Sequence, residues 1–311
     1  MRLGVLDVGS NTVHLLVVDA HDGAHPTPIF KHKADLRLAE SLNKAGELTK
    51  SGEQSLVKFV SQAKEISDAQ GCDRLLPFAT SAVRDATNSK AVLESVLRKT
   101  DVELRVLSGA DEARLTFLAV RRWYGWSAGQ LLCLDIGGGS LELGIGIDEM
   151  PEVAASLPLG AGRLTREWLT SDPASKSEVA ALREYVDGLI ADAIQPFRDV
   201  DDPHHVVATS KTFRSLARLT GAAPSSEGIR VYRELTLAGL RQLIGFISHM
   251  SSRDLANLEG VSSARAHQLL AGAIVAESAM RHLDIPSVQI CPWALREGVI
   301  LRQLDMMSDG E

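Results

Sequence analysis

The stretch Leu131-Leu-Cys-Leu-Asp-Ile-Gly-Gly-Gly-Ser-Leu-Glu142 repeats the pattern of Leu3-Gly-Val-Leu-Asp-Val-Gly-Ser-Asn-Thr12 at the start of the chain. In each stretch an apolar run ends in an aspartate and an aliphatic residue, and a turn of small residues leads into a second apolar run. Glycine and serine turns allow an anion to approach backbone N–H groups closely. The repeat predicts a duplicated fold that holds a phosphate chain between its halves. Two ordinary hairpins with acidic turn residues are the alternative.

Composition limits the class of protein. The chain has 311 residues, a formal net charge of −7 and three widely separated cysteines without a CxxC pair. This length suits two domains, and the negative charge argues against a nucleic-acid partner. The cysteine spacing indicates neither a disulfide framework nor a zinc site. No signal-peptide pattern or membrane-length apolar run is visible, so we expect a cytoplasmic protein with no membrane partner.

Strands alternate with helices in the first third of the chain, which is typical of an α/β sheet with helices on its faces. Strands are expected at 2–7, 13–19, 27–38, 75–79 and 103–107, and helices at 51–70, 90–98 and 111–122. Ser51 with Gln54 predicts a capping box at the start of the first of these helices.

The segment 124–130 is the expected domain boundary, because the strand-turn-strand pattern restarts after it. Strands are expected within 131–147 and at 153–157, 205–209 and 288–291, and helices at 161–169, 176–197, 212–219, 236–249, 263–283 and 293–306. We therefore expect one domain at 1–126, joined by a returning C-terminal helix at 294–311, and a second at 127–293.

Two further turns carry groups suited to phosphate. Arg84 follows the small residues of Ala79-Thr-Ser-Ala-Val-Arg-Asp85 and can form a bidentate contact with phosphate. Pairing with Asp85 is the alternative. In Val207-Ala-Thr-Ser-Lys-Thr212, Ser210 and Lys211 at a helix start are candidates to hold a distal phosphate. Ser210 or Thr212 could instead cap the helix.

Several carboxylates accompany these turns. Asp111 and Glu112 open a predicted helix, where acidic residues are favourable for electrostatic reasons alone. Glu112, if it faces the cleft, can orient and deprotonate a water. Asp135 and Glu142, together with Asp7, form an oxygen-rich set suited to Mg²⁺. Each acid could otherwise be a solvated turn residue.

The motifs in 5–15, 79–84, 108–115 and 134–142 resemble those of the exopolyphosphatase / guanosine pentaphosphate phosphohydrolase family. The resemblance runs from residue 3 to about residue 298. That family belongs to the superfold of actin, Hsp70 and the sugar kinases. The resemblance implies an α/β fold of two actin-like, ribonuclease H-like domains with a cleft between them.

The resemblance also implies roles for individual residues. Glu112 would activate the attacking water, and Asp135 and Glu142 would hold Mg²⁺ and assist catalysis, with K⁺ as a candidate activator. The groups that would contact phosphate are Ser10, Asn11, Arg84, Gly137, Gly138, Gly139 and Ser140. Asp111 stands where the family usually has glutamate. Residues 208–211 replace a glycine-rich turn, and Lys211 there favours bare phosphate chains over a nucleotide.

The expected function is therefore an exopolyphosphatase that releases terminal orthophosphate from linear inorganic polyphosphate. Alternatives are a pppGpp 5′-phosphohydrolase, an ATP-dependent sugar or acetate kinase, and a non-enzymatic phosphate sensor or actin-like assembly protein. A homodimer is expected, which would widen a basic channel. Its candidate lining residues, each otherwise a solvated surface charge, are Arg163, Arg166, Lys211 and Arg265.

Overall fold

The computed structural model describes residues 1–21, 23 and 25–308, and the chain divides into two compact units. Unit 1 comprises residues 1–115 and the segment from Leu295, and unit 2 comprises residues 116–294. The division falls within helix α4 (Gly109–Tyr124), whereas the predicted boundary lies at 126/127. The expected segment 294–311 includes residues 309–311, which lie outside the described residues. The domain boundaries themselves stay a prediction.

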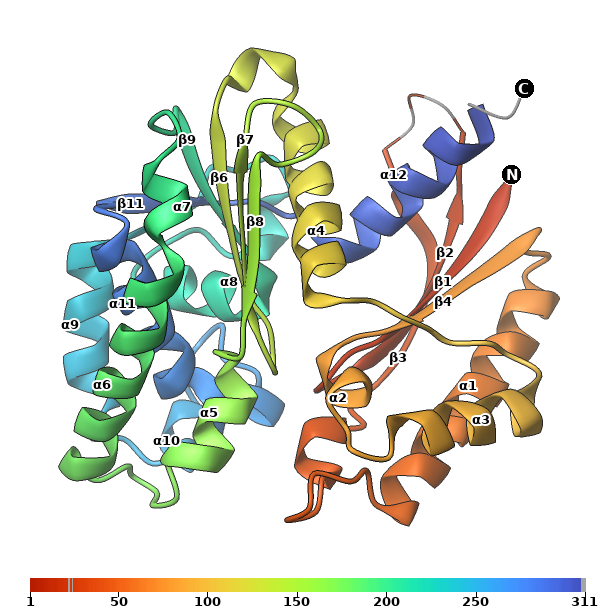
Figure 1. Ribbon diagram of the computed structural model, residues 1–311, viewed down its shortest axis with the longest axis horizontal. Coiled ribbons are helices and arrows are strands. Elements are labelled where there is room, and N and C mark those ends of the chain that lie inside the picture. The colour runs from red at the N-terminus through yellow and green to blue at the C-terminus, as the bar shows by residue number, and fades with distance from the viewer. Residues whose placement is uncertain (22, 24, 309–311) are drawn as a thin grey trace. The chain divides into compact units, whose positions relative to one another are not determined.

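Unit 1 is built on a five-stranded mixed sheet with strand order β3-β2-β1-β4-β5 (Figure 1). Its strands are β1 (Arg2–Val8), β2 (Val13–Asp19), β3 (Pro28–Ala34), β4 (Arg74–Ala79) and β5 (Arg105–Val106). The first three form an antiparallel meander, while β4 runs parallel to β1 and β5 parallel to β4.

Helices cover both faces of this sheet because apolar residues point alternately to either side of β1. Leu6 and Val8 pack in one core with α1 (Lys50–Ala69) and α3 (Ser89–Thr100). Leu3 and Val5 pack in a second core with α12 (Leu295–Ser308), the C-terminal helix. Figure 1 shows α12 and the α1–α3 pair on opposite faces of the sheet. The short elements of the unit are η1 (Leu38–Ser41) and α2 (Ser81–Arg84).

Unit 2 repeats the topology of unit 1. Its sheet has the order β10-β11-β9-β6-β7-β8. The strands are β6 (Leu131–Ile136), β7 (Leu141–Gly146), β8 (Val153–Leu157), β9 (His205–Thr209), β10 (Glu234–Thr236) and β11 (Ser287–Ile290). Strands β6 to β8 form an antiparallel meander, and β9 and β11 follow in parallel, so only the edge strand β10 is an addition. The predicted α/β class and the predicted duplication are confirmed.

The helices of unit 2 pack mainly on one face of its sheet, against Leu132, Leu134 and Ile136. They include α5 (Ala161–Trp168), α6 (Lys176–Ala193), α7 (Gln195–Arg198), α8 (Ser210–Leu219), α9 (Leu237–Ile247), α10 (Ser252–Leu255) and the buried α11 (Leu269–His282). The end of α4 packs on the sheet at Gly144, where an added Cβ would lie 3.2 Å from the Phe117 ring. Among the described residues, no helix is both long enough and apolar enough to span a bilayer.

Some predicted element boundaries are wrong. The strand expected at 27–38 ends at Ala34, because Arg37 adopts a left-handed conformation (φ 47°) before η1 begins. The strand at 103–107 is reduced to two residues. The helix at 176–197 ends at Ala193 and restarts as α7, in which Pro196 lacks a backbone N–H. The helix at 263–283 begins as the 3-10 segment η4 (Ser263–Gln268).

The predicted capping box at Ser51 is also wrong. Helix α1 begins at Lys50, and its N-cap is Thr49, whose hydroxyl accepts a hydrogen bond of 3.2 Å from the Gly52 N–H. Both threonine and serine are favourable N-cap residues, and serine ranks somewhat higher. The position of the cap therefore depends on where the preceding chain turns away from the helix axis.

Candidate active site

The two small-residue turns have the same backbone geometry. In unit 1 the Gly9 N–H donates to the Thr12 carbonyl at 3.2 Å, and in unit 2 the Gly137 N–H donates to the Ser140 carbonyl at 2.9 Å. The two turns differ in the residue that lies opposite the aspartate two positions before the turn. Asp7 lies opposite His14, and Asp135 lies opposite Glu142. The two halves therefore share a scaffold but not its chemistry.

In the triple-glycine turn of unit 2, two carbonyls accept hydrogen bonds from the start of α5, whereas two N–H groups have no acceptor among the described residues. The Gly137 carbonyl accepts from the Ala161 N–H at 3.0 Å, and the Gly138 carbonyl accepts from the Arg163 N–H at 2.9 Å. The N–H groups of Gly138 and Gly139 donate to no atom of the described residues. Adjacent N–H groups that donate no hydrogen bond within the protein are suited to bind an anion.

Gly160, which the sequence did not single out, fixes the position of this turn. It precedes α5, and a Cβ added there would lie 2.2 Å from the Gly139 carbonyl carbon. The two backbones touch because neither residue carries a side chain. No residue-type pattern predicts such a contact, since it joins segments that are remote in sequence.

Polar residues lie in register across four strands of unit 2. Asp135 on β6 is opposite Glu142 on β7 and Thr209 on β9. Glu142 is opposite Ser156 on β8, whose hydroxyl donates to Glu142 Oε1 at 3.0 Å. Residues in register on neighbouring strands lie on the same face of a sheet. The structure thus brings Asp135 and Glu142 together, as predicted, and adds Ser156 and Thr209, which the sequence did not single out.

The turn between β9 and α8 repeats the one between β4 and α2. The segment Ala208-Thr-Ser210 matches Ala79-Thr-Ser81, and the threonine is the extended N-cap in both. Ser210 has a φ of 86°, a conformation that non-glycine residues rarely adopt and that is common at ligand-binding sites. Its hydroxyl also accepts a 3.4 Å hydrogen bond from Phe213 N–H, so Ser210 helps to cap the first turn of α8, although Thr209 is the N-cap residue.

Basic residues gather beside this turn. Lys211 and Arg265 line the same small cavity of about 20 Å³, together with the buried Gln268. Of the four cations expected along a channel, these two are placed together within unit 2.

In unit 1, Arg84 and Glu112 form an ion pair, and Glu112 is only 6% exposed. Arg84 also donates to Asp85 Oδ1 at 3.0 Å and to the Leu107 carbonyl at 3.1 Å. Burial lowers the pKa of the Arg84 guanidinium, but the charges of Glu112 and Asp85 raise it overall. The pairing of Arg84 with Asp85 is therefore observed, together with a second pair to the candidate catalytic carboxylate Glu112. The contact of Arg84 with phosphate stays a prediction.

Asp111 has a local role beside Glu112. The Ser108 hydroxyl donates to Asp111 Oδ2 at 2.7 Å and accepts from the Asp111 N–H at 3.1 Å. This reciprocal arrangement satisfies a backbone donor at the start of α4. Asp111 therefore stabilises the helix end on which Glu112 is held.

The turn of unit 1 is held by neighbouring segments. The Ser10 and Ser81 hydroxyls are both buried and lie 2.8 Å apart. The Ser10 carbonyl accepts from Ala39 N–H, and the Asn11 carbonyl accepts from Arg37 N–H, so the η1 segment covers the turn.

Asp7 faces α12. Its Oδ2 lies 3.8 Å from Arg296 Nε, an ion pair that the sequence did not predict. Across residues 1–21, 23 and 25–308, no three His, Cys, Asp or Glu side chains gather as a metal cage. The joint site of Asp7 with Asp135 and Glu142 draws on both units and stays a prediction.

Comparisons with known proteins agree with these motifs. The Ppx/GppA phosphatase family matches residues 17–307. Exopolyphosphatase 1 of Mycobacterium tuberculosis (strain H37Rv) is 62% identical over 310 residues, which cover 100% of this chain and 90% of the relative. Exopolyphosphatase 1 of Mycobacterium leprae is 60% identical over 310 residues, covering 100% of this chain and 91% of the relative.

Two solved structures carry the same fold. An exopolyphosphatase from Cytophaga hutchinsonii has a TM-score of 0.85 at 23% identity, with 98% of each chain covered. The Ppx/GppA family member of Aquifex aeolicus has a TM-score of 0.81 at 22% identity, with 100% of this chain and 99% of that chain covered. The predicted actin-like α/β fold is confirmed by this likeness.

Proposed function

Because the chain belongs to the Ppx/GppA phosphatase family, we propose that it is an exopolyphosphatase. It releases terminal orthophosphate from linear inorganic polyphosphate. Its relatives named Exopolyphosphatase 1 support this substrate, since they are at least 60% identical across the whole chain. The observation that carries the proposal is the triple-glycine turn, whose Gly138 and Gly139 N–H groups donate to no described atom.

The reaction transfers the terminal phosphoryl group to water. Glu112 orients the water and takes its proton as the water oxygen attacks the terminal phosphorus. The bridging P–O bond breaks, orthophosphate departs, and the shortened chain keeps the bridging oxygen. This transfer requires mainly positioning and charge stabilisation. Arg84 pairs with Glu112 and can turn its remaining donors to phosphate oxygens.

Asp135 and Glu142 are the residues that would hold Mg²⁺. Their oxygens suit this ion, which commonly binds one or two carboxylates together with water and substrate phosphates. When bound, Mg²⁺ supplies neutralisation of the phosphate charge. Ser156 orients Glu142 through its 3.0 Å hydrogen bond. Ser10, Asn11, Ser140, Ser210 and Lys211 are proposed phosphate contacts. Asp7 as a further ligand, K⁺ activation, a homodimer and a cytoplasmic location all stay predictions.

The substitution Glu112→Gln tests the reaction. We expect kcat for orthophosphate release to fall by about 10²- to 10⁴-fold, because the amide cannot accept the proton. Polyphosphate binding, measured by calorimetry, should persist. Asp111→Asn is the matched control, because the Asp111 carboxylate accepts from the Ser108 hydroxyl and pairs with Arg114 at 3.7 Å, and it should keep most of the activity.

Two outcomes would overturn the proposal. One is full turnover by Glu112→Gln. The other is a clear preference for pppGpp over polyphosphate when the wild-type chain is assayed on both, which would assign the chain to pppGpp hydrolysis.

A further inference from the structure

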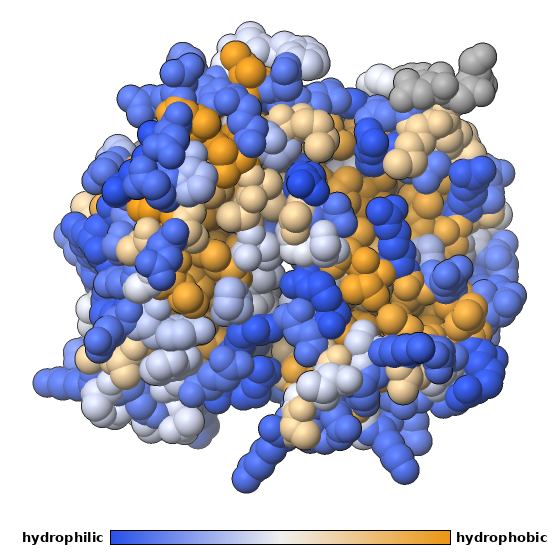
Figure 2. Space-filling view, viewed as in Figure 1, coloured by the Kyte–Doolittle hydropathy of each residue, from blue (hydrophilic) through white to orange (hydrophobic). Residues whose placement is uncertain are grey.

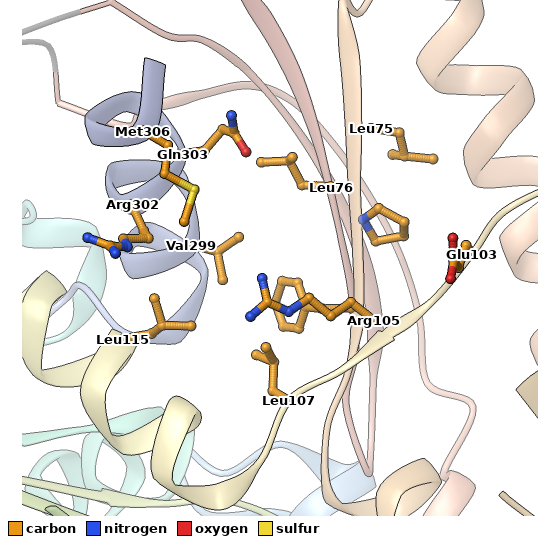
Figure 3. Close-up of a pocket in the computed structure, with 12 residues that line it drawn as sticks. Leu75, Leu76, Glu103, Arg105, Leu107, Leu115, Val299, Arg302, Gln303 and Met306 are labelled. Carbon is orange, nitrogen blue, oxygen red and sulfur yellow. The ribbon is translucent and has the colours of Figure 1, made fainter. Parts of the chain in front are cut away.

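A pocket of about 440 Å³ lies within unit 1, between α12 and the β4–β5 edge of the sheet (Figure 3). Its walls are largely apolar and include Leu76, Phe78, Leu107, Leu115 and Val299. Figure 2 shows apolar surface, in orange, over the part of unit 1 where α12 and β4 lie. Pockets of this size with apolar walls and a few polar groups are typical of small-molecule sites. The proposed reaction uses none of this surface.

The polar groups of the pocket give it a preference for anions. Figure 3 shows the Arg105 side chain extending from β5 toward Val299 and Leu107. Arg302 and Glu103 also line the pocket, which leaves its charge positive by one. Among the described residues, neither the Arg105 nor the Arg302 guanidinium forms an ion pair or a hydrogen bond. A guanidinium without a partner beside apolar walls matches a carboxylate attached to an apolar body.

The α12 wall of the pocket is fixed at one end. A Cβ added at Gly298 would lie 1.9 Å from the Leu115 carbonyl oxygen, so the backbones of α12 and α4 touch there. Val299 and Leu115 line the pocket next to this contact. The α12 wall is therefore held by a backbone contact at this end of the pocket.

The pocket shares its wall with the segment that carries Glu112. Leu107 and Leu115 line the pocket on either side of Glu112 in the sequence. The Leu107 carbonyl accepts the 3.1 Å hydrogen bond from Arg84, and Arg84 pairs with Glu112. A ligand that presses on Leu107 or Leu115 thus acts on both ends of the Arg84–Glu112 pair.

We propose that this pocket binds a small amphipathic monoanion, an apolar body with a single carboxylate, and that its occupancy changes the rate of polyphosphate hydrolysis. Arg105 binds the carboxylate, and the apolar walls bind the body. The regulatory part rests on the proposed function, whereas the binding part stands on the pocket alone.

Calorimetry on the full chain tests the binding part with decanoate and with decanol, its neutral counterpart. We expect the wild type to bind one decanoate per chain. Decanol should bind to the wild type about tenfold more weakly than decanoate does, and decanoate should bind to Arg105→Gln about tenfold more weakly than to the wild type. Arg253→Gln, a matched loss of an exposed arginine on α10 of unit 2, should bind as the wild type does. Leu76→Trp or Val299→Phe, which fill the pocket, should abolish binding. Equal binding of decanoate and decanol, or unchanged binding by the pocket variants, would overturn the proposal.

Hydrolysis assays test the regulatory part. Saturating decanoate should change kcat/KM for polyphosphate by about fivefold in the wild type and not in the pocket-filled variants. An unchanged rate with decanoate bound would refute the regulatory part. If no polyphosphate is hydrolysed at all, the proposed function fails, but the calorimetry still decides whether the pocket binds its ligand.

Discussion

Glu142 and His14 occupy the same position in the two sheets, each opposite an aspartate, yet only Glu142 can serve as an anionic metal ligand. Its carboxylate is oriented by the hydroxyl of Ser156 on the next strand. Groups that orient metal ligands commonly contribute 10- to 100-fold, in order of magnitude, to metal affinity. Ser156 is therefore as informative a target as the carboxylates themselves.

Ser156→Ala should raise the Mg²⁺ concentration needed for half-maximal hydrolysis by about tenfold, with little change in the maximal rate. A Mg²⁺ titration of the chelator-treated enzyme measures this. Ser61→Ala is the control, because Ser61 likewise donates to a carboxylate, Glu65, but on α1. An equal shift in both variants, or none in either, would contradict the role given to Ser156.

Gly160→Ala should disturb the triple-glycine turn, since its Cβ would meet Gly139 backbone atoms at 2.2 Å. We expect a stability loss of about 1–3 kcal/mol, as for other overpacked sites, and a raised KM for polyphosphate. Gly188→Ala on α6 is the control, because nothing lies within 4 Å of its new methyl group. That variant should gain about 0.5–1 kcal/mol in denaturant unfolding. An equal change in unfolding free energy and in KM in both variants would contradict a close contact between residue 160 and the triple-glycine turn.

Motif residues could be predicted from the sequence, whereas their partners could not. Asp135 and Glu142 lie on either side of a glycine turn that the sequence shows directly. A hairpin at this turn places the two residues opposite each other. Within unit 2, Thr209 lies beside Asp135 through strand register. Within unit 1, Arg296 lies beside Asp7 through helix packing. Such neighbours depend on the assembled fold and leave no local pattern in the chain.

At the scale of elements, α6 shows how a single side chain can organise a helix start. Glu178 accepts backbone hydrogen bonds of 2.8 Å from both Thr170 and Ser175, in a capping box with Ser175. Hydrogen bonds from the Ser171 hydroxyl, then from the Ser175 backbone and the Thr170 hydroxyl, lower the pKa of Glu178 well below its ordinary value of 4.5. The loop 170–175 is thereby tied to the helix.

This capping gives a pH-dependent contribution to stability. Because the folded pKa of Glu178 lies below its unfolded value, the contribution is complete above pH 4.5 and is lost as the pH falls toward the folded pKa. Glu178→Gln should therefore lower Tm at pH 7, and the difference from wild type should narrow below about pH 4.5. Thermal scans of both proteins from pH 7 to pH 3 would measure this difference in Tm. A difference in Tm that stays constant over this range would contradict a lowered pKa of Glu178.

The presence of a helix was easier to predict than the residues at which it begins and ends. The periodicity of apolar residues correctly located α1, α6 and α11, but each differs at an end. Thr49 caps α1 in place of Ser51, and α6 ends at Ala193, before Pro196. These limits depend on competing caps and on local backbone geometry, which residue type alone does not determine.

For the whole molecule, binding of substrate should be visible as stability. A ligand that binds only the folded chain stabilises it by about 2.7 kcal/mol at 100 times its Kd. Glu112→Gln with polyphosphate and Mg²⁺ should therefore melt several degrees higher than without polyphosphate, because the substrate is bound but not consumed. Sulfate at equal ionic strength is the control. An identical Tm in polyphosphate and in sulfate would contradict specific binding.

The duplicated architecture was predictable because both copies keep the same short signal, an aspartate before a small-residue turn. The division of the chain was less accessible. Helix α4 continues through residue 115, where the chain passes from one unit to the other. The breaks that are visible in the sequence, Gly109 and Gly125, lie at the ends of this helix. A continuous helix gives no compositional sign that its two ends belong to different compact units.

The presence of His14 in one sheet and Glu142 in the other depends on both hairpins belonging to a single chain. In a dimer of identical chains, every mutation appears twice, and the two partners cannot specialise. Tandem hairpins within one polypeptide are encoded separately, so a substitution in one leaves the other unchanged. Position for position, the two hairpins of this chain keep one backbone pattern and carry different side chains.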